Sequence, residues 1–276
     1  MKTSIVKKVL TYALLIFFAA LILIPLLWAV STSVKPGNEI FSLPPRWIPK
    51  NITLENYRNV LFHSSIPRYF INSLYIGLIT AAFSLLFGGA AGYGFARYKI
   101  TGSKGLSLFM LMSQMLPLIV LMIPIYFMMD RFRLIDSPIG LAISYLVFTM
   151  PLVTWMSRSY FLGIPKELRE AAEIDGCSQI QALFAVELPL AAPGIAATGI
   201  YAFIMAWNEF ILASVLTLSD KSRTLPIGLS EFSTMFTVDW GGTMAAAVLI
   251  SVPVIILFLW LQKYFISGLT MGSVKG

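Results

Sequence analysis

Six long uncharged runs alternate with polar segments along the chain. The runs cover residues 9–34, 69–96, 105–129, 137–157, 188–208 and 240–262. A helix needs about 20 apolar residues to cross the hydrocarbon core of a bilayer, and each run is long enough. We expect the fifth run to continue past Glu209 to Leu218. The pattern therefore predicts an all-α polytopic membrane protein with six transmembrane helices, forming one domain over residues 1–276.

The polar segments set the expected topology. With six spans, both termini lie on one side, together with the basic loop 97–104 and the loop 158–187. That side carries eleven Lys and Arg residues and the other side nine, a weak bias that favours a cytoplasmic location for the first group. The lysines before the first run also fit a signal peptide. The apolar run exceeds the usual core of about 7–15 residues, so we expect a retained first span.

Composition excludes several classes of protein. The chain is 58% hydrophobic and 12% charged, whereas a soluble domain carries roughly 25% charged residues. We interpret the net charge of +7 as Lys and Arg residues flanking the spans, not as a site for nucleic acid. The one cysteine, Cys177, and the one histidine, His63, are far apart in sequence, so we expect no metal site and no internal disulfide.

The stretch from Glu170 to Pro193 predicts two short helices around a sharp turn. Gly176 suits the left-handed position that ends a helix. Ser178 and Gln181 have the spacing of a capping box for the second helix. We expect that helix to run to Leu188, with its junction to the next span at Pro189.

The same stretch resembles the signature loop of ABC-importer permeases. The family pattern is Glu-Ala-Ala, three residues, Gly, nine residues, Ile, one residue and Leu-Pro. The matching positions are Glu170, Ala171, Ala172, Gly176, Leu188 and Pro189, while Val186 replaces the Ile. The resemblance implies a type I importer fold in which these residues and Asp175 dock into a cleft of a separate ATPase on the cytoplasmic side. An amphipathic linker on the membrane surface is the alternative.

Two further segments resemble the carbohydrate branch of that family. They are the AWNEFILA segment, which begins at Ala206, and the C-terminal GLTMGSVKG, which resembles the tail of the second permease subunit of maltose-type importers. The resemblance implies that the tail, residues 263–276, contacts the ATPase dimer through Gly272, Val274, Lys275 and Gly276. It also implies a second, different permease subunit, two ATPase subunits, an extracytoplasmic solute-binding protein and a sugar substrate, in the inner membrane of a bacterium or archaeon.

Candidate substrate contacts lie near the end of the fifth run. Glu209 is the only acidic residue that we place within a span, and it follows Trp207 and Asn208, which could stack on a sugar and hydrogen-bond to it. Intramembrane charges usually face a cavity or a partner. Alternatively, Glu209 lies near the outer interface and is solvated there. We expect the amides of Gln114 and Asn72 to tie helices together.

The sequence lacks the motifs of a catalytic subunit. It contains no G-x-x-x-x-G-K-[ST], no serine nucleophile elbow and no H-E-x-x-H. We therefore expect no catalytic residues and no cofactor bound by this chain, with ATP and Mg²⁺ held by the partner ATPase. The runner-up function is a secondary transporter subunit, which would need coupling-ion sites near the bilayer midplane. A membrane-bound sensor or assembly factor is a third possibility, and the sequence does not identify the sugar.

Overall fold

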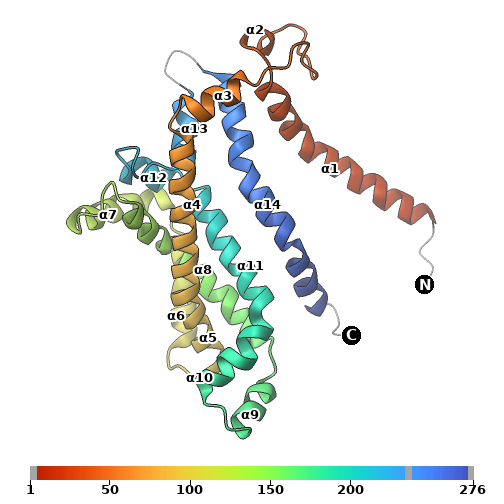
Figure 1. The fold of residues 1–276 in the computed structure, drawn as a ribbon. Coiled ribbons are helices and arrows are strands. Elements are labelled where there is room, and N and C mark those ends of the chain that lie inside the picture. Colours follow the sequence, from red (N-terminus) through yellow and green to blue (C-terminus); the bar gives the residue numbers. More distant parts are fainter. Residues whose placement is uncertain (1–4, 234–237, 273–276) are drawn as a thin grey trace. The chain divides into compact units, whose positions relative to one another are not determined.

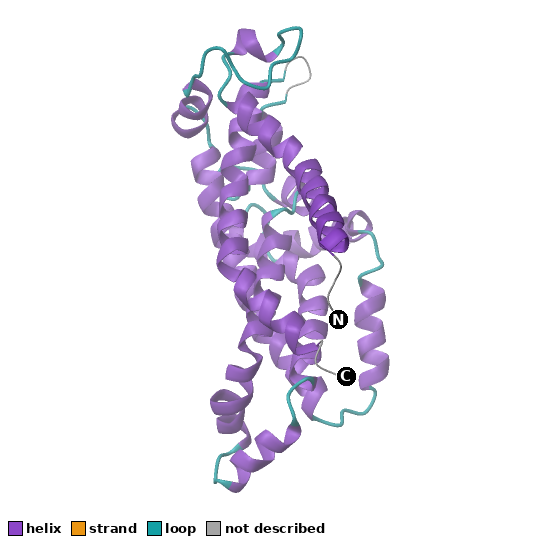
Figure 2. Cartoon of the chain, turned by 90° about the vertical axis from the view of Figure 1, so that its right-hand side faces the viewer, coloured by secondary structure: helices purple, strands orange, loops and turns teal. Residues whose placement is uncertain are grey.

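The computed structural model describes residues 5–233 and 238–272, and side chains within residues 7–259 of this part. The described chain is built of helices joined by loops (Figures 1 and 2). The first half contains α1 Ile5–Ser33, α2 Gly37–Ile40, α3 Glu55–Phe62, α4 Ile66–Phe83, the π-helical turn η1 Ser84–Gly89, α5 Ala90–Arg97, α6 Ser103–Ser113 and α7 Leu118–Arg131. The second half contains α8 Pro138–Leu162, α9 Lys166–Ile174, α10 Gln179–Ala182, η2 Leu183–Glu187, α11 Leu188–Trp207, α12 Ile211–Leu216, α13 Leu225–Glu231 and α14 Trp240–Gly272.

The predicted all-α membrane fold is confirmed, although several boundaries differ. Among the described residues, five continuous helices are long and apolar enough to cross a membrane: Lys7–Ser33, Ile66–Arg97, Pro138–Leu162, Gln179–Trp207 and Trp240–Leu259. The third predicted span is broken, because α6 and α7 meet at an angle of 100°. The fifth ends at Trp207 and does not continue to Leu218. The last helix continues to Gly272, ten residues beyond the predicted end.

The chain divides into two compact units. Unit 1 contains residues 1–67 and 228–252, and unit 2 contains residues 68–227 and 253–276. In unit 1, the polar segment after α1 folds around Lys35, whose side chain is buried. Its ammonium group donates a hydrogen bond to the Arg46 carbonyl (2.7 Å) and lies 4.1 Å from the centre of the Trp28 ring. Glu39 accepts hydrogen bonds from the backbone N–H groups of Lys50 and Asn51.

In unit 2, α5 and the preceding turn η1 pack closely against α8. A Cβ atom added to Gly92 would lie 2.7 Å from the Thr154 carbonyl oxygen and 2.8 Å from the Ser157 Cβ. Gly88 also faces α8, with Val153 Cγ1 at 3.0 Å from an added Cβ. Gly88 and Gly92 are four residues apart, the spacing of a small-residue packing face, and only glycine permits this approach of the two backbones.

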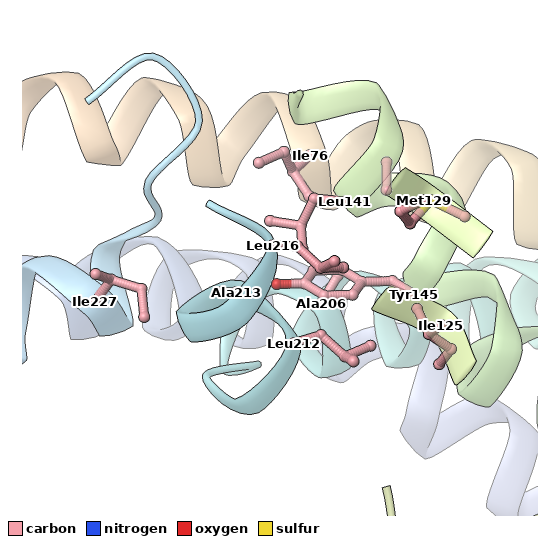
Figure 3. Packing of buried hydrophobic residues seen from close by; sticks show 11 residues of the cluster. Ile76, Ile125, Met129, Leu141, Tyr145, Ala206, Leu212, Ala213, Leu216 and Ile227 are labelled. Atoms are coloured by element: carbon pink, nitrogen blue, oxygen red, sulfur yellow. The ribbon is translucent and has the colours of Figure 1, made fainter. Parts of the chain in front are cut away.

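A second region of unit 2 is filled by apolar side chains around Tyr145 (Figure 3). The buried cluster draws on α4, α7, α8, α11, α12 and α13, and its members are Ile76, Ile125, Met129, Leu141, Ala142, Tyr145, Ala206, Leu212, Ala213, Leu216 and Ile227. Because α7 and α12 are short and follow helix breaks, this packing fixes both segments against the long helices α4 and α8.

Candidate functional site

The first candidate site is the α9–α10 loop, residues 163–187. The loop begins at Gly163 and not at residue 158, because α8 continues to Leu162. Helix α9 ends in a Schellman motif, in which Gly176 N–H donates to the Glu173 carbonyl (3.1 Å) and Cys177 N–H donates to the Ala172 carbonyl (3.0 Å). Gly176 has φ +94° and nothing within 4 Å of an added Cβ, so backbone conformation alone requires glycine there. The predicted left-handed turn at Gly176 is confirmed.

The start of α10 has the predicted capping box. Gln181 N–H donates to Ser178 Oγ (3.3 Å), and Ser178 N–H donates to Gln181 Oε1 (2.8 Å). The predicted junction at Pro189 is absent, because α10, η2 and α11 form one continuous helix from Gln179 to Trp207. The wider π-helical turn η2 ends at Glu187, two residues before Pro189, where it can relieve the clash of a proline ring with the preceding turn.

The loop exposes apolar side chains at its tip. Ile174 is 85% exposed, Ile180 70% and Phe184 63%, and they come from α9, α10 and η2. Of the residues predicted to dock, Glu170, Ala171, Asp175, Gly176 and Pro189 are exposed. Ala172 is buried, and Leu188 packs partly buried against Tyr93, Ala96 and Phe161. A turn held by local hydrogen bonds thus presents an apolar and acidic surface that is exposed in the described part of the chain.

A buried ion pair holds the base of the α9–α10 loop. Glu187 accepts from Arg97 Nε (2.5 Å) through one carboxylate oxygen and from the Tyr93 hydroxyl (2.8 Å) through the other. Arg97 also donates to the Ile164 carbonyl (3.2 Å). The side chains of Arg97 and Glu187 are 1% and 0% exposed. We did not predict this pair, although a lone acidic residue in the apolar stretch around Glu187 was a usable signal.

The second candidate site is a cavity of about 580 Å³ at two helix breaks. One break separates α6 from α7 and the other separates α11 from α12. The amides of Gln114 and Asn208 lie in a wall that is otherwise mostly apolar. The full set of lining residues is Ser113, Gln114, Leu116, Leu118, Leu121, Val147, Phe148, Met205, Asn208, Glu209, Phe210 and Ile211. Broken membrane helices place backbone polar groups beside a cavity, where solute or water can satisfy them.

The structure separates the three predicted substrate contacts. Asn208 is exposed and lines the cavity, and Glu209 borders the same cavity. Glu209 is only 8% exposed, and its carboxylate accepts from Leu212 N–H (2.8 Å) and Ala213 N–H (3.1 Å). It caps α12, so it is not the solvated interface residue of the alternative reading. Trp207 is 1% exposed and stacks on Phe203, so its ring is unavailable to a solute.

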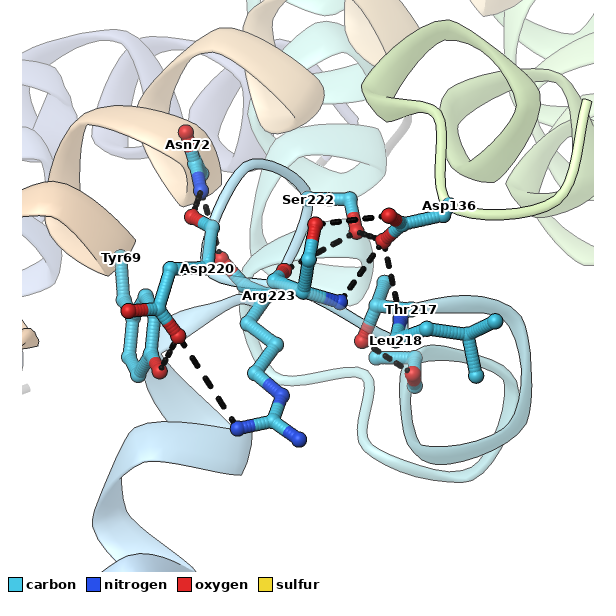
Figure 4. Close-up of polar contacts among 10 residues, drawn as sticks. Tyr69, Asn72, Asp136, Thr217, Leu218, Asp220, Ser222 and Arg223 are labelled. Carbon is cyan, nitrogen blue, oxygen red and sulfur yellow. Dashed lines mark hydrogen bonds and ion pairs between the residues drawn. The ribbon is translucent and has the colours of Figure 1, made fainter.

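A carboxylate ties the loop before α8 to the loop after α12 (Figure 4). Asp136 accepts from Leu218 N–H (2.9 Å), Ser219 N–H (2.9 Å) and Ser219 Oγ (2.6 Å), and also from Ser222 Oγ. Burial acts to raise the pKa of Asp136, but these hydrogen bonds outweigh it and hold that pKa well below its usual value. The contact therefore stabilises the far end of α12, the helix that Glu209 caps.

The loop after α12 is also held by the start of α4. The Tyr69 hydroxyl donates to Asp220 Oδ1 (2.7 Å), and the Asn72 amide donates to the carbonyls of Asp220 (3.1 Å) and Arg223 (2.9 Å) (Figure 4). Asn72 therefore ties a helix to a loop, whereas we expected it to tie two helices. Gln114 also differs from expectation, because it lines the cavity at the α6–α7 break.

Comparison with known proteins gives concordant matches. The family described as binding-protein-dependent transport system inner membrane component matches residues 84–270. The diacetylchitobiose uptake system permease protein of Streptomyces coelicolor is 37% identical over 252 residues, covering 91% of each chain. The trehalose/maltose transport system permease protein of Thermococcus litoralis is 33% identical over 279 residues, covering 100% of each chain. A chain of a bacterial ABC transporter that imports the acidic polysaccharide alginate has a TM-score of 0.82 at 23% identity, covering 96% of this chain and 98% of that chain.

Proposed function

The chain belongs to the family of binding-protein-dependent transport system inner membrane components, and on that premise we propose that it is a permease subunit of an ATP-driven importer for a sugar or sugar-like solute. The sugar class is supported by relatives whose names specify diacetylchitobiose and trehalose/maltose uptake. The expected assembly contains a second permease, two ATPase subunits that hold ATP and Mg²⁺, and an extracytoplasmic solute-binding protein. Both termini and the α9–α10 loop would face the cytoplasm.

The observation that carries this proposal is the exposed surface of the α9–α10 loop. Ile174, Ile180 and Phe184 would be costly to leave in water, because burying one such side chain contributes roughly 1.5–3 kcal/mol. The Schellman motif and the capping box hold both sides of the turn, so the surface keeps its shape when force is applied to it. Glu170 and Asp175 add negative charge suited to a basic cleft. The C-terminal contacts expected at Val274, Lys275 and Gly276 lie outside the described residues.

Two substitutions in the α9–α10 loop, one of backbone shape and one of charge, test the docking role. Gly176→Val forces a β-branched residue into a left-handed conformation, which costs roughly 1–2 kcal/mol. Glu170→Lys reverses a charge on the exposed face. Both variants should insert into the membrane but lose co-purifying ATPase or solute-stimulated ATP hydrolysis. Asp130→Lys, an exposed charge reversal outside the loop, is the matched control. Normal co-purification and stimulation in both loop variants would refute the proposal.

We further propose that the cavity at the two helix breaks is part of the solute path. Gln114 and Asn208 offer amide donors and acceptors to hydroxyl groups, and the remaining wall is largely apolar. Of the three expected substrate contacts, this assignment retains Asn208. Glu209 acts indirectly, because it caps α12, and Gln114 takes the place of Trp207 as a contact.

Transport by the reconstituted complex tests this path. Gln114→Ala and Asn208→Ala should each raise the half-saturating concentration of solute-loaded binding protein or lower the maximal rate, while the complex stays intact. Asn59→Ala, which removes an exposed amide outside the cavity, should match the wild type. Unchanged transport in both cavity variants would remove them from the path. Transport that stops with an ionophore and continues without ATP would favour the secondary transporter instead.

A further inference from the structure

A separate pair of hollows lies between α6 and α8. The larger has a volume of about 290 Å³, and its lining residues are Ser103, Lys104, Ser107, Leu108, Leu111, Trp155 and Arg158. The smaller adjoins it through Ser107, Leu111, Trp155 and Arg158 and adds Phe95, Met110, Pro151 and Thr154. We call the two together the α6–α8 groove. It shares no lining residue with the cavity at the helix breaks.

The polarity of the α6–α8 groove changes in the same direction along both helices. On α6 it starts with Ser103 and Lys104 and ends at Leu111. On α8 it starts with Arg158 and ends at Pro151, because the two helices run in opposite directions past the groove. At 1.5 Å per residue, the change from cationic to apolar takes about 10–12 Å. This is the pattern of a site for an amphiphile with a charged head.

The charged end of the groove favours an anion. Neither α6 nor α8 contains an acidic residue, and the sequence has none between Glu55 and Asp130. Within the part of the chain that the structure describes, Lys104 and Arg158 form no ion pair with a carboxylate. Arg158 lies 6.0 Å from the centre of the Trp155 ring, and Ser103 and Ser107 provide hydroxyl donors. Two cations and two hydroxyls thus meet without a balancing negative charge.

We propose that the α6–α8 groove binds an anionic phospholipid, with the phosphate between Lys104 and Arg158. The glycerol and the first acyl carbons would lie along Leu111, Trp155 and Pro151. A water molecule takes roughly 30 Å³, so the larger hollow holds on the order of ten non-hydrogen atoms, enough for a phosphate and a glycerol. Helix α8 is long and apolar enough to span a membrane, and α6 is the first half of the bent pair α6–α7, which is apolar enough as a whole; basic pockets between membrane helices suit anionic headgroups. The assignment of this lipid to the cytoplasmic leaflet rests on the proposed function, but the proposal that the groove binds the lipid does not.

Native mass spectrometry of the purified transporter complex tests the lipid site. The probes are dihexanoyl phosphatidylglycerol, the zwitterionic dihexanoyl phosphatidylcholine, and glycerol 3-phosphate as a headgroup without chains. Lys104→Gln and Arg158→Gln should each weaken phosphatidylglycerol retention about fivefold, the effect of one cation near an anionic surface. Arg158→Lys should retain most of the binding. Lys99→Gln removes an exposed cation from the same basic loop outside the groove and should have no effect.

Three results would overturn the lipid proposal. Equal retention of phosphatidylglycerol by the wild type and both Gln variants would place the lipid elsewhere. Equal retention of phosphatidylcholine would remove the requirement for negative charge. Binding of glycerol 3-phosphate as tight as that of the lipid would make the groove a site for small anions. None of these results depends on docking of the ATPase or on solute transport, so they leave the proposed function unaffected.

Discussion

The buried Arg97–Glu187 pair gives the sharpest test of how the base of the α9–α10 loop is held. Glu187→Gln keeps the shape of the side chain and an oxygen that can accept from the Tyr93 hydroxyl. It removes the negative charge that lies 2.5 Å from Arg97 Nε. Arg97 then keeps one hydrogen bond, to the Ile164 carbonyl, while its side chain is 1% exposed. The variant therefore leaves a cation buried without a counter-charge.

The expected cost follows from that burial. Breaking a buried ion pair by removing one partner destabilises a protein by about 3–5 kcal/mol. For a chain of this size, each kcal/mol corresponds to roughly 2–4 °C in the unfolding temperature. We expect Glu187→Gln to lower the Tm by roughly 6–20 °C, as measured by the thermal unfolding of the detergent-solubilised complex. The partly exposed pair Arg169–Glu173 is the control, because Glu173→Gln removes a helix-surface interaction of about 0.3–0.5 kcal/mol.

A double variant separates the loss of the pair from the presence of an unpaired charge. Arg97→Met combined with Glu187→Met replaces both ions with apolar side chains of similar length. Since well-packed apolar replacements of a buried pair are often neutral, the double variant should recover most of the loss seen with Glu187→Gln. A Tm for Glu187→Gln within 2 °C of wild type, or a double variant with a lower Tm than Glu187→Gln, would refute this reasoning.

Three further predictions concern other parts of unit 2 and the orientation of the chain. Asp136→Asn should destabilise the protein at neutral pH. Because the pKa of Asp136 is lowered in the folded state, the carboxylate contributes its full stabilisation above about pH 4 and loses it at lower pH. The stability of the variant should therefore depend less on pH in an acid-unfolding measurement. Gly92→Ala should cost about 1–3 kcal/mol by overpacking against Thr154, whereas Gly105→Ala, with open space around it, should not destabilise. A membrane-impermeant maleimide should label Cys177 in inside-out vesicles stripped of ATPase and not in intact spheroplasts; labelling from outside would reverse the proposed orientation.

The sequence predicted best what depends on neighbours a few residues apart. Gly176 and the Ser178–Gln181 capping box form their contacts within five residues, so spacing alone identifies them. The four-residue spacing of Gly88 and Gly92 is likewise a local pattern, and small residues at this spacing indicate the packing face that the structure shows against α8. The residues that meet across the fold were not readable: Arg97 and Glu187 are 90 positions apart, and Asp136 is more than 80 from its serine partners.

Helix breaks were the other failure, and the prolines show why. Pro25, Pro124, Pro151 and Pro253 lie inside continuous helices, whereas Pro117 is the last residue of the break between α6 and α7, which meet at 100°. A membrane helix tolerates proline when neighbouring groups satisfy the freed carbonyls, so the residue alone does not locate a break. The bend at Gln114 to Pro117 and the break at Asn208 depend on tertiary packing, because the short helices α7 and α12 that follow them pack around Tyr145.

The continuity of α10, η2 and α11 changes how the two candidate sites relate. A junction at Pro189 would have let the α9–α10 loop move independently of the fifth span. The observed helix runs unbroken for 29 residues, about 43 Å at 1.5 Å per residue, from Gln179 at the loop to Trp207 beside the cavity. In the proposed function, a displacement of the loop by the ATPase therefore reaches Asn208 through one rigid element. Arg97, at the end of the second span, forms an ion pair with Glu187 near the loop end of that helix, so the second span would move with the helix.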